Sequence, residues 1–430
     1  MKYINNINMQ NNNVWKINGK YYDLTKFVDI HPGGKEILSS CKGIDSTAAF
    51  KSYHTFVKMS RVETTMKKYE IEYSGRLIEL PFVTFNEDGF YHELQTKVKE
   101  QMQNKNRKWT WKWLCISLLT FYMYAHYFLT AFLCTKYLFV HRMIASIISG
   151  TALMQWMLQM YHDATHSSIS SNKYINHAVY VIGSALSFWD MSTWIKHHSV
   201  LHHSFTGDYN LDPDMRHTHP LFKKSIHSKA SIVQNPNIIV GILSIFPGMF
   251  FGQILAYAIL QFRKKLWGFE IESTKTFAEL SIILVQICIM VYGQSIILPC
   301  LFLLALNINY SIAILPDHDL FETHLNHKEG SIDWGEMQVR NSGNFAQDNV
   351  IFTALYGGIN FQIEHHLFPS LCSCHLPEIS DIVQEMCKKY DIKYVSNPSV
   401  IKAYLSAIKR FATINKPKEI NKPKEINKQN

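Results

Sequence analysis

The residues best suited to chemistry are histidines that gather in three short clusters along the chain. Histidines four residues apart lie on one face of a helix, so each cluster can direct several imidazoles into one site. A lone histidine on such a face is usually structural, whereas clusters repeated at three places predict a metal centre. The clusters contain His162 and His166, then His198, His202 and His203, and then His365 and His366 behind Gln362.

The number and type of these side chains indicate two metal ions. A structural zinc site closes with four ligands, and here seven or eight imidazoles are available. His202 and His203 differ by about 100° around a helix, so they could serve different metals. Imidazoles suit zinc, copper, iron or nickel, and the sequence lacks the Glu-x-x-His pairs of soluble di-iron bundles. From these residues alone, two irons and two zincs that catalyse hydrolysis both remain open.

Two further histidines lie near the N-terminus. His31 belongs to His31-Pro32-Gly33-Gly34, where proline restricts φ and the glycines let the backbone turn beneath a flat ligand. His54 follows on a predicted helix. Two neutral imidazoles facing each other would complete a six-coordinate haem iron suited to electron transfer. Their spacing alone also fits two surface histidines. Before them, Asn18-Gly19 predicts a type I′ hairpin.

Long apolar helices must position the three clusters. Trp113–Leu133 and Met143–Tyr161 are each long enough to cross about 30 Å of hydrocarbon, and a buried hairpin in a soluble core is the alternative. Phe277–Leu298 and Pro299–Leu315 form a second pair. The clusters share one membrane face only if an even number of spans separates them, so we interpret Ile238–Phe262 as an interfacial or re-entrant helix. We therefore expect four spans, with both termini cytosolic because six basic residues precede the first: Lys97, Lys99, Lys105, Arg107, Lys108 and Lys112.

The composition favours a membrane protein over a protein that binds nucleic acid. The 430-residue chain has a formal net charge of +9, but its basic residues lie beside apolar runs and in the tail, which fits an anionic membrane face. The polar start lacks an apolar segment, so we expect no cleaved signal peptide. Residues 414–425 repeat Ile-Asn-Lys-Pro-Lys-Glu, which predicts a disordered polar tail.

Two family resemblances join these features. Residues 22–28, the His31-Pro32-Gly33-Gly34 turn and residues 43–54 resemble cytochrome b5, which implies a haem b held by His31 and His54. The three clusters resemble those of the front-end fatty-acid desaturases, which carry an N-terminal cytochrome b5 domain and a glutamine at the position of Gln362. Three further motifs support that resemblance, namely Asp333-Trp334-Gly335-Glu336, Gln338-Val339-Arg340 and residues 357–361.

The resemblance implies a small α+β cytochrome b5-like domain fused to an all-α integral membrane domain with four transmembrane helices and a cytosolic histidine-rich cap. We expect the haem domain over residues 1–78, a linker over 79–108, the membrane desaturase domain over 109–413 and the polar tail over 414–430.

The resemblance also assigns two non-haem iron ions to the clusters. An additional ligand follows the last span in relatives, and His318 matches it best, with His324 and His327 as competitors. His197 is expected beside the metals, and Asp163 and Glu364 are expected to orient imidazoles through their free N–H groups. His217 and His219 are interpreted as part of a polar loop. The implied ligands are His162, His166, His198, His202, His203, His318, His365 and His366, with Gln362 at the substituted position.

The implied activity is O2-dependent insertion of a cis double bond between an existing double bond and the carboxyl end of an unsaturated acyl chain, most simply of the Δ5 or Δ6 type. The substrate would be a fatty acyl lipid or acyl-CoA. Electrons would come from an NADH-cytochrome b5 reductase through the fused haem, and the membrane would be the endoplasmic reticulum. The alternatives are a sphingoid-base desaturase, a fatty acyl hydroxylase or acetylenase, and a membrane-anchored cytochrome that only carries electrons.

Overall fold

The computed structural model describes residues 13–80, 83–216, 218, 221–228, 231–245, 265–266, 269–270, 276–323 and 331–415. From residue 416 onward, the predicted polar tail therefore lies outside the described residues.

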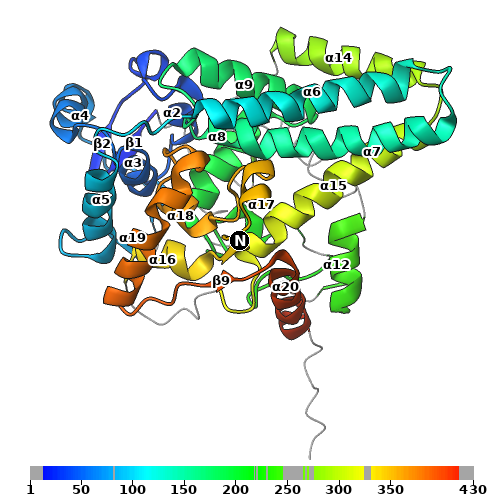
Figure 1. Ribbon diagram of the computed structural model, residues 1–430. Coiled ribbons are helices and arrows are strands. Elements are labelled where there is room, and N and C mark those ends of the chain that lie inside the picture. The colour runs from blue at the N-terminus through cyan, green and yellow to red at the C-terminus, as the bar shows by residue number, and fades with distance from the viewer. Residues whose placement is uncertain are drawn as a thin grey trace, which may run out of the picture.

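The N-terminal unit has the predicted α+β character (Figure 1). Its strands β1 (Trp15–Ile17) and β2 (Lys20–Tyr22) form an antiparallel hairpin, and β3 (Glu70–Ile71) pairs with β2. Asn18 and Gly19 have φ values of 50° and 77°, as the predicted type I′ turn requires. The helical segments are η1 (Val28–Ile30), α2 (Lys35–Ser40), α3 (Thr47–Tyr53), α4 (Met59–Met66) and η2 (Lys67–Tyr69).

Among the described residues, three helices are long and apolar enough to cross a membrane. They are α6 (Trp111–Leu133), the continuous helix Phe139–Thr165 and α15 (Ile297–His318). The middle one consists of α7 (Phe139–Trp156), a π-helical turn (Met157–Tyr161) and α8 (His162–Thr165). Figure 1 shows α6, α7 and α15 extending together away from the N-terminal unit. Large apolar side chains stay exposed on α6, among them Leu118, Leu119 and Tyr122, as expected of a face that meets lipid.

Of the four predicted spans, the described residues contain three as helices long and apolar enough to cross a membrane, and the predicted span Phe277–Leu298 is a shorter helix. Helix α14 (Phe277–Tyr292) has only 16 residues, about 24 Å at 1.5 Å per residue and thus short of the hydrocarbon core. The chain turns after it, so Ile297 and Leu298 of the predicted span belong to α15 instead. Pro299 lies in the first turn of α15, where its missing N–H costs no hydrogen bond, and the helix therefore begins before it.

Helices α14 and α15 still run out and back as a hairpin. Histidines that precede α14 and histidines that follow α15 meet in one site, so the chain must return to the side it left. α14 packs on α6 and on α9 (Lys173–Leu186). Of the predicted interfacial segment 238–262, the structure describes α12 (Pro236–Ile245), and the remainder lies outside the described residues.

The close crossing of α7 and α15 at Gly150 leads to a prediction about stability. A Cβ atom at Gly150 would overlap the backbone carbonyl of Phe302, which cannot swing aside as a flexible side chain would. We expect Gly150→Ala to cost about 1–3 kcal/mol, as overpacking usually does, and to lower the unfolding temperature measured in detergent. Gly241→Ala on α12 is the matched control, since a Cβ there meets no atom within 4 Å. Equal unfolding temperatures for the two variants would contradict this packing.

The remaining elements form a cap that carries the histidines of the second and third clusters. The predicted linker over residues 79–108 contains α5 (Phe90–Gln101), which buries Phe90, Tyr91 and Leu94 against the cap. Two short parallel strand pairs, β4 (Val83–Thr84) with β7 (Ile332–Asp333) and β8 (Asn344–Phe345) with β9 (Ser396–Asn397), tie distant segments together. β5 (Lys265–Leu266) and β6 (Phe269–Glu270) are antiparallel. The other helices are α10 (Met191–Trp194), η4 (Ile195–His202), α11 (His203–Phe205), η5 (Pro213–Met215), α16 (Trp334–Asn341), α17 (Val350–Leu355), α18 (Gln362–Leu367), η6 (Ser373–His375), α19 (Leu376–Lys389) and α20 (Val400–Ile414).

Candidate metal centre

Four histidines from three distant segments form one buried group, termed the first group below. His162 and His166 come from α8 and its C-terminal end, His198 from η4 and His365 from α18. One ring nitrogen of each lies within 4.8 Å of the others. The Nε2 atoms of His162 and His198 are 3.0 Å apart.

Three more histidines form a second group beside the first. His202 comes from η4, His318 from the end of α15 and His366 from α18. Their ring nitrogens also lie within 4.8 Å of one another, and all three side chains are buried. Gln362 belongs to this side of the site, because its Nε2 is 2.9 Å from His318 Nε2. Two groups of imidazoles are what two metal ions would require.

The second cluster supplies histidines to both groups. It lies on η4, a π-helix and not the predicted α-helix, and His198 and His202 still share one face, with stacked rings whose centroids are 5.5 Å apart. His198 belongs to the first group and His202 to the second, because different segments pack against them. His203 lies between them, with its Nε2 3.2 Å from His365 Nε2 and its ring stacked on His366 at 4.2 Å between ring centroids.

The hydrogen bonds of the second group leave two lone pairs facing each other. His202 Nδ1 donates to Asp212 Oδ1 at 3.1 Å, and His318 Nδ1 donates to the Asn341 carbonyl at 2.9 Å. When both rings are neutral, as metal binding requires, each has a bare Nε2, and these two atoms are 3.1 Å apart. The amide N–H of Gln362 contacts only His318 Nε2, so the lone pair of His202 Nε2 has no donor from Gln362. A metal ion holds imidazole nitrogens at about 2.0–2.1 Å. If the angle between two such bonds is between 90° and about 109°, the two nitrogens lie roughly 3.0–3.4 Å apart. The distance between His202 Nε2 and His318 Nε2 therefore fits a shared metal.

Buried nitrogens elsewhere in the site also fit bound metal. His166 Nε2 and His366 Nε2 are buried without a hydrogen-bond partner, as is Oε1 of Gln362. Burial, followed by the neighbouring imidazoles, lowers the pKa values of His198, His203, His365 and His366 well below the usual range. These rings are therefore neutral near pH 7, the form in which an imidazole binds metal.

His202 differs because carboxylates lie behind it. Burial disfavours its cation, but Asp212 and Asp214 outweigh burial and raise its pKa. These carboxylates hold the His202 ring through Nδ1, the usual arrangement behind a metal-bound imidazole. Asp212 also accepts the backbone N–H groups of Gly207 and Asp214, which fixes its own orientation.

The prediction that Asp163 and Glu364 orient imidazoles by hydrogen bonds is wrong. Asp163 instead accepts from the backbone and hydroxyl of Ser373, and its carboxylate comes no closer than 3.5 Å to His162 Nδ1. Glu364 accepts from Asn344 and Tyr394. Both carboxylates make their hydrogen bonds to other parts of the cap, so they fasten α8 and α18 to it.

Other side chains, which the sequence analysis left without a role, hold the rings. Gln338 on α16 accepts from His366 Nδ1 at 2.9 Å. The Tyr53 hydroxyl lies 2.6 Å from His166 Nδ1, although Tyr53 belongs to the N-terminal unit. Gln338 and Tyr53 both lie in motifs that carried the family resemblances, but their contacts join residues far apart in the chain. In the sequence, the only signal for Gln338 and Tyr53 was that each lies within a family motif.

The N-terminal histidine pair has the geometry of a ligand pair for one flat cofactor. The ring centroids of His31 and His54 are 6.3 Å apart, which leaves room for one ion between two ring nitrogens at about 2 Å each. Each Nδ1 donates to a backbone carbonyl, His31 to Gly34 at 3.0 Å and His54 to Phe50 at 2.8 Å, so each Nε2 carries a lone pair. Burial lowers the pKa of His31 to about 4 and also lowers that of His54. These neutral imidazoles fit the axial ligands of a haem.

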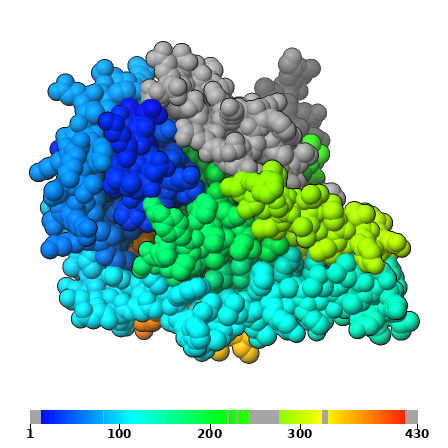
Figure 2. Space-filling model, turned by 90° about the horizontal axis from the view of Figure 1, so that it is seen from above, coloured from blue at the N-terminus to red at the C-terminus, as the bar shows by residue number. Residues whose placement is uncertain are grey.

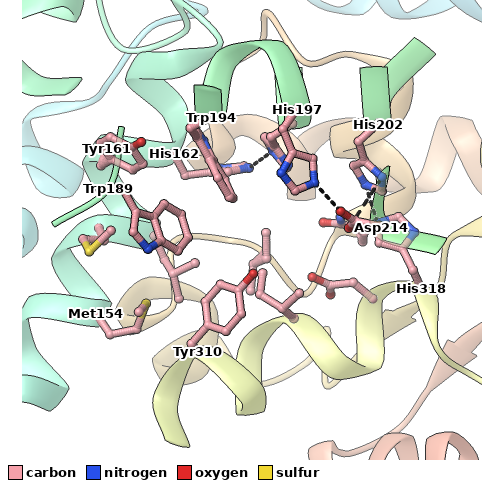
Figure 3. A pocket seen from close by; sticks show the side chains of 17 residues that line it. Met154, Tyr161, His162, Trp189, Trp194, His197, His202, Asp214, Tyr310 and His318 are labelled. Atoms are coloured by element: carbon pink, nitrogen blue, oxygen red, sulfur yellow. Dashed lines mark hydrogen bonds and ion pairs between the residues drawn. The ribbon is translucent and has the colours of Figure 1, made fainter. Parts of the chain in front are cut away.

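A pocket leads from the apolar helices to the histidines (Figure 3). Its apolar lining includes Met154, Trp189 and Tyr310, while His162, His198, His202 and His318 line its other end. In Figure 3 the rings of Trp189 and Tyr310 lie below the histidines, whereas Trp194 lies beside them. A chain of methylene groups could occupy such a pocket and present one of its carbons to the two groups.

The remaining predicted residues lie at the edge of the site or outside it. His197 lines the pocket and pairs with Asp214 at 2.6 Å, and it belongs to neither group. His217, His219, His324 and His327 lie outside the described residues.

Two family models match the chain. The fatty acid desaturase model matches residues 138–398, which include both histidine groups. The cytochrome b5-like heme/steroid binding domain model matches residues 4–75, which include His31 and His54.

Several curated proteins are similar over nearly their full length. The acyl-lipid (8-3)-desaturase B of Dictyostelium discoideum is 27% identical, with 93% of this chain and 90% of that protein covered. The Delta(5) fatty acid desaturase A of the same organism is 25% identical, with 92% and 89% covered. The acyl-lipid (8-3)-desaturase of Mortierella alpina is 26% identical, with 94% of both chains covered.

Proposed function

The chain belongs to the fatty acid desaturase family, with a cytochrome b5-like domain fused at its N-terminal side, and we propose that it is a front-end acyl desaturase of the Δ5 type. Its class is that of an oxidoreductase acting on a fatty acyl chain with O2. The Δ5 assignment draws on the similar proteins named for that position or for (8-3) desaturation, and Δ6 is the nearest alternative.

The observation that carries the proposal is the pair of histidine groups at the end of an apolar pocket. Acid–base groups cannot break an unactivated C–H bond near neutral pH, so the reaction needs an oxidant. Two bound irons would supply it from O2, whereas zinc has no redox chemistry. We assign the first iron to His162, His166, His198 and His365, and the second to His202, His318 and His366. His203, which lies between the two groups, would be a further iron ligand, and Gln362 would lie beside the second ion, where its amide contacts His318.

The protein's own residues would determine which methylene reacts. The acyl chain would lie against Met154, Trp189 and Tyr310, with the reacting carbons near the histidine end of the pocket. Each added methylene in such a pocket is worth only about 1–3 kcal/mol, so the depth of the pocket can select chain length and position. The burial of the surrounding side chains excludes water from the reacting carbons. We propose an acyl-lipid substrate, as in the names of similar proteins, with acyl-CoA as the alternative.

Electrons would arrive one at a time through the fused haem domain. Tethering that domain to the desaturase keeps its local concentration high. An NADH-cytochrome b5 reductase would reduce it. The basic residues before α6 support a cytosolic location for the haem domain and for both termini. We place the protein in the endoplasmic reticulum, where its substrates and reductase would meet.

Expression in yeast, fed with a panel of polyunsaturated acids, tests the proposal. We expect a new cis double bond at Δ5 in acids that already carry a Δ8 double bond, located by mass spectrometry of the derivatised products. A new bond only at Δ6 would overturn the positional assignment. Hydroxylated or acetylenic acids, or altered sphingoid bases, would favour the alternative reactions. Haem reduction by NADH without any lipid product would indicate an electron carrier.

A further inference from the structure

The haem domain packs against η4 and α11, and Figure 2 shows its blue surface beside the green middle part of the chain. Its helix α2 packs on η4. Polar contacts fasten the same face, since the hydroxyl of Ser167 donates to the carbonyl of Gly33 at 2.8 Å and Lys173 donates to the carbonyl of Asp29 at 2.9 Å. Lys196 of η4 donates to the carbonyl of Ser40. These bonds orient the domain as well as attach it.

Tyr53 reaches from the haem domain into the metal centre. Its hydroxyl lies 2.6 Å from Nδ1 of His166 and 3.2 Å from the backbone carbonyl of Ser199. The two rings are close to parallel, with centroids 5.9 Å apart and an interplanar angle of 19°. Tyr53 also directly precedes His54, the candidate haem ligand. A single residue therefore connects the haem site to the histidine centre.

The hydrogen-bond directions around Tyr53 follow from the chemistry of its partners. A carbonyl oxygen can only accept, so the contact with Ser199 is a hydrogen bond only when the hydroxyl proton of Tyr53 points to it. In that arrangement the hydroxyl oxygen accepts the N–H of His166, which places the ring proton on Nδ1. The other nitrogen, Nε2, is left as a bare lone pair, and it is the buried atom of His166 that has no hydrogen-bond partner. Tyr53 thus selects the one neutral form of His166 that can offer Nε2 to a metal.

We propose that Tyr53 is a positioning residue for the metal centre, supplied by the haem domain, so that docking of the haem domain and metal binding by the first group strengthen each other. The identity of the metal as iron rests on the proposed function. The contact between Tyr53 and His166 does not depend on it. The bond behind a metal-bound imidazole typically contributes about 10–100-fold in metal affinity. Linkage requires the effect to be reciprocal, so bound metal must also hold the haem domain in place.

The test is Tyr53→Phe in the full-length, haem-loaded protein after its non-haem metal has been removed with a chelator. Phenylalanine keeps the ring against His166 and removes only the hydroxyl. The metal-free protein is titrated with Co²⁺, a spectroscopic probe that needs no turnover. We expect one of the two bound Co²⁺ ions to bind about 10–100-fold more weakly than in the unaltered protein, while the other is unchanged.

Haem absorbance and hydrogen exchange serve as the second readouts. We expect Tyr53→Phe to keep its haem spectrum, because His31 and His54 are intact. Adding Co²⁺ should slow amide exchange in α2 and α3 of the unaltered protein and much less in Tyr53→Phe. Tyr73→Phe is the matched control, since Tyr73 belongs to the same domain and its ring contact is with Tyr21.

Unchanged Co²⁺ affinities in Tyr53→Phe, or equal weakening in Tyr73→Phe, would overturn the proposal. Exchange in α2 and α3 that does not respond to Co²⁺ in the unaltered protein would also overturn it. None of these readouts requires a desaturated product. Failure of the proposed function would instead appear as intact Co²⁺ coupling without any lipid product.

Discussion

Replacing His366 with alanine is expected to abolish desaturation and to remove one of the two iron ions. His366 is buried in the second group with His202 and His318, its Nε2 has no hydrogen-bond partner, and Gln338 fixes its other nitrogen. Losing it leaves two imidazoles for that ion. Activity should fall by more than about 100-fold, because even residues behind metal ligands are typically worth 10–100-fold. Iron analysis of the purified protein and product formation in yeast are the measurements.

The matched control for this experiment is His92→Ala. His92 is exposed on α5 and belongs to neither histidine group. It should keep full iron content and activity. Haem absorbance should stay normal in both variants, which separates loss of the iron site from general misfolding. Full activity of His366→Ala with unchanged iron would disprove its role as a ligand.

Replacing His54 with alanine is expected to remove the haem and, with it, most desaturation. His54 lies opposite His31 at 6.3 Å between ring centroids, and no other histidine occurs within residues 1–78 to take its place. A haem held by one remaining imidazole would dissociate readily or bind with an open position on its iron. The absorbance of the reduced haem in the purified protein and the product yield in yeast are the measurements.

Iron content separates the two centres in the His54→Ala protein. It should remain near that of the unaltered protein, since Tyr53 and the histidine groups are intact. His31→Ala should behave in the same way, because the two ligands act on one haem. Full desaturation by purified, haem-free His54→Ala, supplied only with NADH and the reductase, would remove the proposed electron route through the fused domain.

The chemistry of this protein was largely predictable from local sequence. Metal-binding residue types and their spacing are local properties, so the three histidine clusters, Gln362 and the pair His31 and His54 stand out without a structure. The hairpin at Asn18 and Gly19 is local for the same reason. The predicted span Phe277–Leu298 was too long, because hydropathy marks where apolar residues occur and not where the chain turns between α14 and α15.

The grouping of the ligands depended on the tertiary structure. His198 and His202 share one face of η4, but the segments that pack against them place His198 in the first group and His202 in the second. Hydrogen bonds between distant segments likewise decide which residue contacts the Nδ1 atom of each imidazole. Glu364 is adjacent to His365 and turns away from it, whereas Tyr53, 113 residues before His166, reaches its Nδ1.

The sequence by itself therefore determined the kinds of ligand, the fused haem domain and the presence of long apolar helices, because these follow from residue type and local period. Only the tertiary structure decided which imidazoles meet, which tautomer each adopts and how the haem domain docks. Those properties depend on hydrogen bonds between distant segments, and a buried ring nitrogen takes whichever partner the packing brings to it.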